Sequence, residues 1–264
     1  YLPTLSQLAE SFRRTKPHKA QGADGITSDL LRAAPLQMAR HAHPLQLKAA
    51  LLLQEPLGYK HGKAIPIPKA DVTPLTPEDY RSILLNSEFG KHHHRFLRNA
   101  LNTVLEHALA DTQVGGRVGC STAMAYHTSA AYIRQLRNTG QSGLLLFVDL
   151  RAAFHKVIRQ TVVDTSVTDP DDHDVDDIIA ATPIPSTLVP VMEMILAQPA
   201  VLQQLAHPHL AAQIATAHHL THFQCNHSTS PALPLTGTRP GSALADETPS
   251  STSASTYHYD SSLA

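Results

Sequence analysis

The chain has 264 residues, of which 42% are hydrophobic, so it can bury the core of one large domain or of two small ones. A formal net charge of −1 excludes a globally basic protein, so any contact with nucleic acid must come from local patches. Two cysteines exclude a disulfide framework, and no apolar run approaches the roughly 18 residues of a membrane span, so we expect no membrane partner.

The N-terminal residues predict two short helices joined by a turn. Apolar spacing predicts the first helix over residues 5–14. Glycines at both ends of the segment 22–25, Gly-Ala-Asp-Gly, predict a turn. Thr27 or Ser28 is then expected to cap a second helical stretch, because either hydroxyl can accept a hydrogen bond from the first turn.

Prolines shape the next part of the chain. Pro35 and Pro44 are expected to interrupt a Leu- and Ala-rich helical stretch, because proline lacks the N–H that a helix interior requires. The segment 63–69, Lys-Ala-Ile-Pro-Ile-Pro-Lys, is expected to be extended, since each proline drives its predecessor toward β geometry. Residues 86–111 predict a helix with one apolar face. That face carries Leu97, Ala100, Leu101, Val104, Leu105 and Ala108.

A short apolar run that ends on one carboxylate is the most informative feature of the chain. It follows a predicted helix over residues 121–138, with Gly140 as its C-terminal stop. The run 144–148, Leu-Leu-Leu-Phe-Val, predicts a strand buried on both faces. Asp149 at its end is costly unless a bound cation compensates the charge, which points to a metal-dependent site at the rim of a sheet. Alternatively, Asp149 only caps the helix expected to begin near Leu150.

The C-terminal part of the chain predicts shorter elements. Residues 164–185 are acidic and punctuated by prolines, and they predict a solvated loop. Residues 186–205 predict a helix broken by two prolines. Segments 221–225 and 232–236 predict the two strands of a hairpin.

Two other clusters invite a metal interpretation, which the residue spacing disfavours. His92, His93 and His94 are consecutive, and neighbours on a helix point about 100° apart, so three rings cannot converge on one ion. We expect a partly exposed helix face instead, which beside Arg95 could touch nucleic-acid phosphates. The aspartates within 169–177 lack the glycine and glutamate positions of a calcium loop.

Five motif blocks occur in one order between residues 20 and 247. They are Gly22-Ala-Asp-Gly-Ile26; Ile65-Pro-Ile-Pro-Lys69 with Tyr80-Arg-Ser-Ile83; Gln113-Val-Gly-Gly-Arg117 with Gly119-Cys-Ser-Thr122; Phe147-Val-Asp-Leu-Arg-Ala-Ala-Phe154; and Thr236-Gly-Thr-Arg-Pro-Gly-Ser-Ala-Leu-Ala-Asp246. Each block alone is weak. Together they resemble the reverse transcriptase domain of retrotransposons that lack long terminal repeats, which is similar to group II intron reverse transcriptases.

The resemblance implies an α+β, right-hand polymerase fold with fingers and a partial palm. Residues 1–111 would form a fingers-like part, and residues 112–247 the fingers and palm part with the first catalytic aspartate. Beyond the resemblance, the Ser/Thr-rich composition near the C-terminal end predicts a disordered tail over residues 248–264. The family activity is RNA-directed DNA synthesis by nucleotidyl transfer with two Mg²⁺ ions. The implied partners are an RNA template, a DNA primer and deoxynucleoside triphosphates, in an intracellular setting such as the nucleus.

The resemblance also assigns roles to individual residues. Asp149 corresponds to the first catalytic, metal-binding aspartate, and the backbone carbonyl of Leu150 to the neighbouring metal ligand. Phe154 corresponds to the aromatic residue that lies under the sugar and rejects a 2′-hydroxyl. Lys69 and Arg81 correspond to the basic fingers residues that hold the triphosphate, a task that suits both side chains.

The last motif block adds two residues, and one family motif is missing. Arg239 and Gly241 correspond to the turn that lies against the nucleotide and the template. The family completes its metal site with a Tyr/Phe-Ala-Asp-Asp hairpin, which the 264 residues do not contain; Tyr257-His-Tyr-Asp260 is the nearest string. Because one carboxylate under-coordinates two divalent ions, we expect a truncated copy that does not polymerise DNA by itself. The alternative is a non-catalytic, nucleic-acid-binding remnant of a retroelement.

Overall fold

A computed structural model of the protein describes residues 1–69, 73, 75–76, 79–117, 119–148, 157–167, 175–181, 184–225, 230–234, 237 and 244. In chain order the elements are α1 (Leu5–Arg13), α2 (Ser28–Ala33), α3 (Pro35–Leu52), α4 (Leu57–Lys60), β1 (His61–Pro68), β2 (Tyr80–Asn86), α5 (Glu88–Ala108), α6 (Thr122–Thr139), α8 (Arg159–Val162), η2 (Thr165–Val167), α9 (Val175–Ala181), η4 (Ser186–Leu188), α10 (Val189–Leu196), α11 (Val201–Leu205), α12 (Pro208–His218) and β3 (His222–Cys225).

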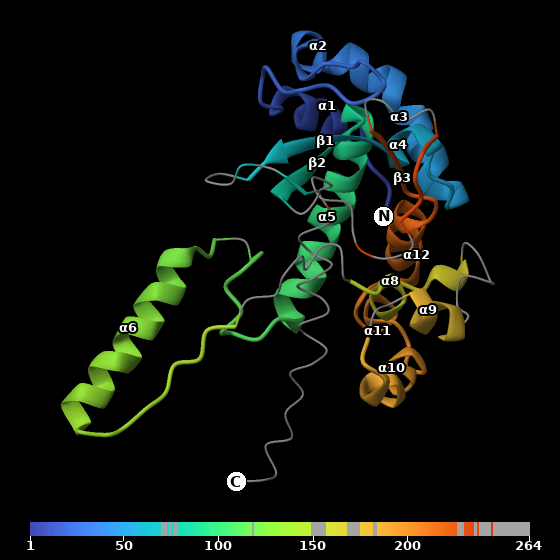
Figure 1. Ribbon diagram of the computed structural model, residues 1–264. Coiled ribbons are helices and arrows are strands. Elements are labelled where there is room, and N and C mark those ends of the chain that lie inside the picture. Colours follow the sequence, from blue (N-terminus) through green and yellow to red (C-terminus); the bar gives the residue numbers. More distant parts are fainter. Residues whose placement is uncertain are drawn as a thin grey trace.

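The long helix α5 runs through the centre of the molecule (Figure 1). Helices α1 to α4 gather around its N-terminal end, and α8 to α12 lie beside its C-terminal half. Helix α6 stands apart from this body. The fold is therefore mixed α and β, with predominant helix and one small sheet, which is compatible with the predicted α+β class.

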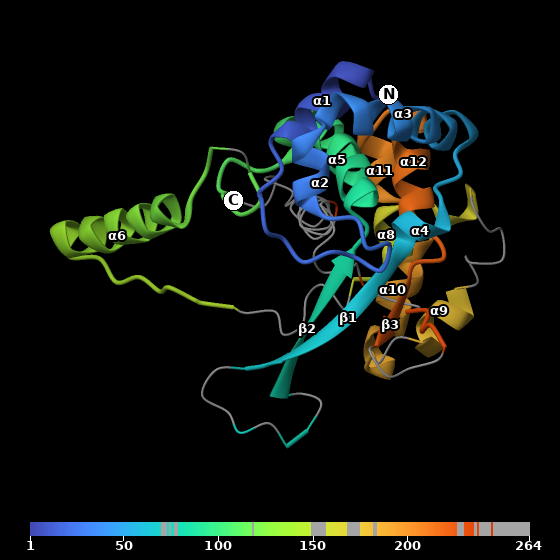
Figure 2. The ribbon, with the colours of Figure 1, turned by 90° about the horizontal axis from the view of Figure 1, so that it is seen from above.

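The sheet of the described residues has three strands in the order β2-β1-β3. Strands β1 and β2 form an antiparallel hairpin, in which Gly62 lies opposite Asn86 and Pro68 lies opposite Tyr80. Strand β3 pairs in parallel with the first half of β1. Among the described strands, the second half of β1 therefore pairs with β2 alone, and this part of the two strands extends beyond the helices (Figure 2).

The larger of two apolar cores lies along the C-terminal half of α5. Leu97, Leu101 and Leu105 recur at helical spacing on one face of this helix, and all three are buried. Leu210 and Ile214 of α12 belong to the same core. Each fully buried aliphatic side chain of this size stabilises the fold by about 1.5–3 kcal/mol relative to exposure. This core therefore anchors α12 against α5.

The smaller core joins the N-terminal helices. Leu8 and Phe12 of α1 are buried together with Leu31 of α2 and Ala39 of α3. Phe89, in the first turn of α5, packs against this cluster. The N-terminal helices are thus attached to the same central helix as the larger core.

A buried arginine ties the C-terminal segments to α8. The guanidinium of Arg159 donates from Nε to the carbonyl of Gly237 (2.7 Å), from Nη1 to that of His218 (3.1 Å) and from Nη2 to that of Pro234 (2.5 Å). The fork of donors that arginine presents suits this arrangement, because one side chain reaches acceptors at the end of α12 and in the chain beyond β3.

The structure confirms most of the helices predicted in the first half of the chain. The helix predicted over residues 5–14 is α1, and those predicted over 86–111 and 121–138 are α5 and α6. Gly140 ends α6 in the left-handed region (φ 64°), which glycine adopts without strain. Thr27 caps α2 by accepting a hydrogen bond from the backbone of the first turn.

The predicted turn and the predicted extended segment are also confirmed. The Gly25 amide donates to the Gly22 carbonyl at 3.2 Å, and Gly25 has a φ of 68°. The segment 63–69 lies in β1 up to Pro68. Two kinds of local signal, turn glycines and prolines in an extended run, were therefore sufficient at these places.

The prediction of a buried strand over residues 144–148 is wrong. The segment follows α6 without regular secondary structure, and Leu146 and Phe147 are 78% and 84% exposed. A strand requires a neighbour that supplies its hydrogen bonds, and the three-stranded sheet of the described residues does not include this segment. Burial of this apolar run would be favourable, but the run itself does not determine which part of the protein would cover it.

Three further predictions need correction. Pro44 does not interrupt the helix but lies inside α3. A proline in a helix interior costs about 3 kcal/mol or more. The buried alanines of α3, which pack against α1, hold the helix in place despite this cost. The predicted loop 164–185 contains helix α9, with acidic residues in its first turn, where the helix dipole favours them. The predicted C-terminal hairpin is a single bridge between Phe223 and Ala232 in the part of the chain that is described.

Other predictions fall outside the described residues. These are the helix expected to begin near Leu150 and the tail 248–264. The division between residues 1–111 and 112–247 stays a prediction.

The helical stretch Ser186–Leu205 is long and apolar enough to cross a membrane, judged by length and composition alone. The sequence predicts a helix broken by prolines over these residues and no membrane span. In the structure this stretch is divided into η4, α10 and α11, with Pro190 in the first turn of α10.

Substitution of Gly22 should destabilise the protein. A Cβ atom at this position would lie 2.6 Å from the carbonyl oxygen of Asn86, which is backbone and cannot rotate away. We expect Gly22→Ala to lower the free energy of unfolding by about 1–3 kcal/mol in urea titrations. Gly58→Ala is the matched control, because a Cβ there meets no atom within 4 Å. Equal stability of the two variants would contradict the close approach.

Candidate functional site

The strand register brings Lys69 and Arg81 onto one face of the β1–β2 hairpin. Arg81 lies opposite Ile67, and the Lys69 amide donates to the Asp79 carbonyl at 2.8 Å, one step beyond the paired strands. Side chains two positions apart on a strand share a face, so Lys69 and Arg81 are diagonal neighbours. Ile83, which is 43% exposed, follows Arg81 on this face. The hairpin thus presents two cations beside exposed apolar side chains.

Asp79 organises the backbone next to these cations. Its carboxylate accepts hydrogen bonds from the Leu75 amide (3.0 Å) and from the amide and hydroxyl of Thr76 (2.8 and 3.0 Å). These bonds, led by that from the Thr76 backbone, hold the pKa of Asp79 below its usual value, and the charge of Lys69 contributes. Asp79 is therefore an anionic, hydrogen-bonded anchor for the hairpin tip.

The remaining predicted site residues lie outside the described part of the chain. These are Asp149, Leu150, Phe154, Arg239 and Gly241. The structure thus brings together one predicted pair, Lys69 with Arg81. Within the described ranges no group of three or more His, Cys, Asp or Glu side chains could hold a metal ion.

The three consecutive histidines of α5 are buried, so the prediction of a partly exposed face is wrong. His92 contacts α1, where its ring nitrogens lie 2.5 Å from the Ser11 hydroxyl and 2.9 Å from the Thr15 hydroxyl. The ring of Phe12 meets it edge-on, with centroids 4.8 Å apart. His92 therefore fastens α5 to α1.

His93 and His94 face different neighbours. The His93 ring lies beside Tyr59 of α4, with centroids 6.1 Å apart. His94 Nε2 is 2.5 Å from Glu55 Oε1, and both side chains are almost fully buried. Because the rings of the row point to separate partners, they serve as three contacts rather than one ligand set.

Burial determines the protonation state of His92 and His93. It lowers the pKa of His92 to about 3, with smaller effects from the charges of Arg95 and Lys91. It also lowers the pKa of His93 to about 4, although the charge of Glu55 acts in the opposite direction. Both rings are therefore neutral at physiological pH and suited to packing and hydrogen bonding.

A cavity of about 750 Å³ lies between α1 and α5. His92, Gln46 and Arg95 line it, and Arg14 lies on its α1 side, where it pairs with Glu10 at 2.7 Å. The walls come from α1, α3 and α5, which are far apart in the sequence. Sequence reasoning missed this cavity because no single motif carries it.

Comparison with known proteins gives no identification. No protein-family model matches the chain, and no curated protein matches it either. Any function must therefore be argued from the residues themselves.

Protonation of the buried histidines should destabilise the fold in acid. In the unfolded chain these rings titrate near 6.5, whereas in the fold His92 stays neutral down to about 3. Stability is therefore fully present above pH 6.5 and is lost as the pH falls toward the folded-state value. We expect His92→Gln to reduce the slope of unfolding free energy against pH by about 1.4 kcal/mol per unit between pH 6 and 4.5.

The measurement is a series of urea titrations across this pH range. His127→Gln is the matched control, because His127 is exposed on α6, and its slope should equal that of the unmodified chain. Equal slopes for all three proteins would contradict the neutral, buried state of His92.

Proposed function

We propose that this chain is a partial reverse transcriptase domain of a retroelement whose β1–β2 hairpin binds the phosphates of a nucleoside triphosphate. One observation carries the proposal: Lys69 and Arg81, both assigned to triphosphate binding by the motif resemblance, share one face of this hairpin. The order of the five motif blocks supports the same family.

The chemistry of the hairpin suits this role. Arginine can hold a phosphate through two parallel hydrogen bonds, and lysine supplies a compact point charge. Asp79 fixes the backbone at Thr76, which lies between Lys69 and Arg81 in the sequence. Asp79 itself lies outside the paired part of the strands. A triphosphate lying along the face would therefore meet both cations at once.

The donor set available for magnesium does not fit two ions. The proposed ligands are one carboxylate, that of Asp149, and one backbone carbonyl, that of Leu150, whereas Mg²⁺ demands near-octahedral oxygen coordination. The described residues add no acidic cluster. We therefore propose no metal-dependent step for this chain, and we assign Phe154, Arg239 and Gly241 to contacts with nucleotide and template.

A second function is a non-catalytic, nucleic-acid-binding remnant of a retroelement. The observation that favours it is the position of residues 144–148, which lie outside the three-stranded sheet instead of forming a strand that leads to Asp149. In this case Lys69 and Arg81 would contact the phosphates of a nucleic-acid backbone.

Removal of the two hairpin cations should weaken nucleotide binding. We expect the double variant Lys69→Ala/Arg81→Ala to bind a fluorescent deoxynucleoside triphosphate at least about ten-fold more weakly, because each charged hydrogen bond contributes about 1.5–3 kcal/mol. Arg40→Ala, an exposed arginine on α3, is the matched control. Fluorescence anisotropy measures both, and unchanged binding by the double variant would refute the proposed grip.

A primer-extension assay distinguishes both proposed functions, the partial domain and the nucleic-acid-binding remnant, from an active polymerase. With an RNA template, a DNA primer, deoxynucleoside triphosphates and Mg²⁺, we expect no extension by the unmodified chain or by Asp149→Ala, while both bind the template–primer. The logarithm of the binding constant should fall with log salt less steeply in Lys69→Ala/Arg81→Ala, by about 0.7–0.9 per lost phosphate contact. Extension that depends on Asp149 would show that the metal site is complete.

A further inference from the structure

The region 122–148 forms an arm that projects from the body of the protein. It consists of α6 and the segment that folds back from it (Figure 1). No residue of α6 is buried. The fold-back begins at Gly140 and is fixed by a hydrogen bond from the Gln141 amide to the Leu136 carbonyl at 3.1 Å. The arm therefore has a defined shape although it packs on little else.

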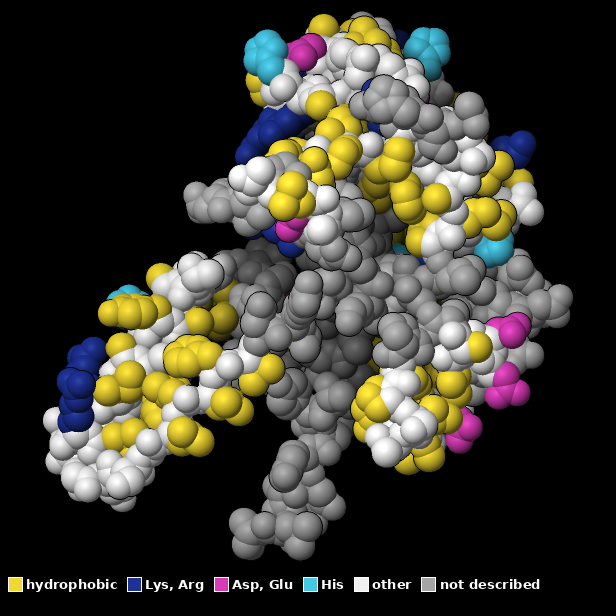
Figure 3. Space-filling view, in the orientation of Figure 1, with side chains coloured by type: hydrophobic (Ala, Val, Ile, Leu, Met, Phe, Trp, Pro, Cys, Tyr) yellow, Lys and Arg dark blue, Asp and Glu magenta, His cyan; other side chains and the backbone are white. Residues whose placement is uncertain are grey.

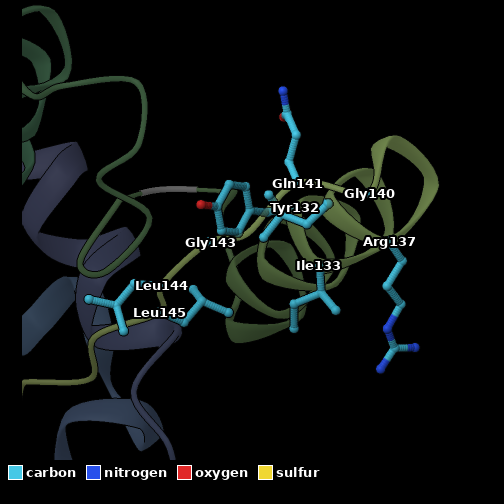
Figure 4. Close-up of a pocket in the computed structure, with 9 residues that line it drawn as sticks. Tyr132, Ile133, Arg137, Gly140, Gln141, Gly143, Leu144 and Leu145 are labelled. Carbon is cyan, nitrogen blue, oxygen red and sulfur yellow. The ribbon is translucent and has the colours of Figure 1, made fainter.

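The arm exposes an unusual amount of apolar surface. A notch of about 480 Å³ lies between α6 and the returning segment, lined by Tyr132, Ile133 and Leu144 among others (Figure 4). Nine large apolar side chains of the arm are exposed. They are Met124, Tyr126, Tyr132, Ile133, Leu144, Leu145, Leu146, Phe147 and Val148. An exposed patch of this extent marks an interaction site more often than a free surface.

A second exposed apolar surface lies on α10 and on the 3-10 turn η4 that precedes it. Leu188, Val191, Met194 and Ile195 recur at spacings of three, four or seven residues, so they share one side of the α10 region, and all are exposed. Figure 3 shows apolar side chains of this region gathered beside acidic ones, on the opposite side of the molecule from the arm. We call this region the α10 surface.

The two surfaces carry opposite charges. The arm contains Arg134 and Arg137 and no acidic residue from 122 to 148. The region 175–205, which includes the α10 surface, contains Asp176, Asp177 and Glu193 and neither lysine nor arginine. Attraction between the arm and the α10 surface is therefore built into the sequence, while contact between two arms or between two α10 surfaces would be repulsive.

In one molecule the two surfaces lie on different sides of the body, with α5 between them (Figure 1). We propose that two copies of this chain associate, the arm of each lying on the α10 surface of the other. A two-fold arrangement of this kind uses both complementary contacts twice and leaves neither surface exposed.

The available area is sufficient for such a dimer. Successive side chains of the arm point in different directions, so about half of the nine can contact one partner. At on the order of 100 Å² each, they and the four apolar side chains of the α10 surface together bring each copy to the ~800 Å² per partner of a stable interface. The notch between α6 and the returning segment is of a size to accept a side chain such as that of Met194. The apolar contacts supply affinity, and the charges select the pairing.

A membrane is the alternative partner of the α10 surface, because the stretch Ser186–Leu205 is long and apolar enough to cross one, judged by length and composition alone. The acidic side chains beside the α10 surface argue against it, since cytoplasmic membrane surfaces are negatively charged and attract basic segments. The second copy is therefore the better fit to the charges.

Complementary charge reversal tests the dimer. The arm variant is Arg134→Glu/Arg137→Glu, and the surface variant is Asp177→Arg/Glu193→Arg; all four side chains are exposed. Sedimentation equilibrium measures the dimer dissociation constant of each protein and of an equimolar mixture. In the mixture every arm meets a surface of opposite charge, whereas each variant alone brings like charges together.

We expect the unmodified chain to dimerise and each variant alone to dissociate at least ten-fold more readily. The mixture should regain the unmodified affinity, and circular dichroism melts should show that both variants remain folded. A monomeric unmodified chain, variants that dimerise as well as it does, or a mixture that stays monomeric would overturn the proposal. So would a monomer that floats with vesicles of phosphatidylcholine and phosphatidylserine.

Discussion

Two kinds of burial hold the central helix α5, and the positions of the other elements follow from them. Its C-terminal half is fixed by leucines that pack against α12, and its N-terminal half by three imidazole rings with separate partners. The apolar half requires only close packing, whereas the polar half also requires that the buried rings of His92 and His93 stay neutral. Because β2 leads directly into α5, the direction of the hairpin is set by this same helix. The cations at the hairpin tip thus depend on packing far from them.

Local signals in the sequence were sufficient wherever the structure is decided locally. Turn glycines at 22–25, the cap at Thr27 and the stop at Gly140 each act through the backbone of their own neighbours. Prediction failed where distant contacts decide. The run 144–148 has the composition of a buried strand but lacks a partner in the described sheet. Pro44 is exposed, and α3 continues past it because other residues of that helix are buried.

The candidate site was predictable in the same uneven way. The position of Lys69 and Arg81 on one face of the hairpin follows from its register, once an extended segment and a turn are recognised. The burial of His92, His93 and His94 was not predictable, because histidine is as common at surfaces as in cores and the covering groups come from α1, α4 and the segment before α4. The cavity between α1 and α5 was missed for a similar reason. Motif reading identifies chemistry along the chain, and packing decides which of it is exposed.

The contacts of Arg159 have a consequence for how the C-terminal third comes apart. One guanidinium holds the carbonyl of His218, at the end of α12, together with those of Pro234 and Gly237, which lie close together in the chain beyond β3. These parts of the chain cannot detach one after another, because the loss of one bond leaves the same buried charge less compensated for the other two. Amide protons around these three residues should therefore exchange with solvent in a single cooperative opening rather than fraying from the chain terminus.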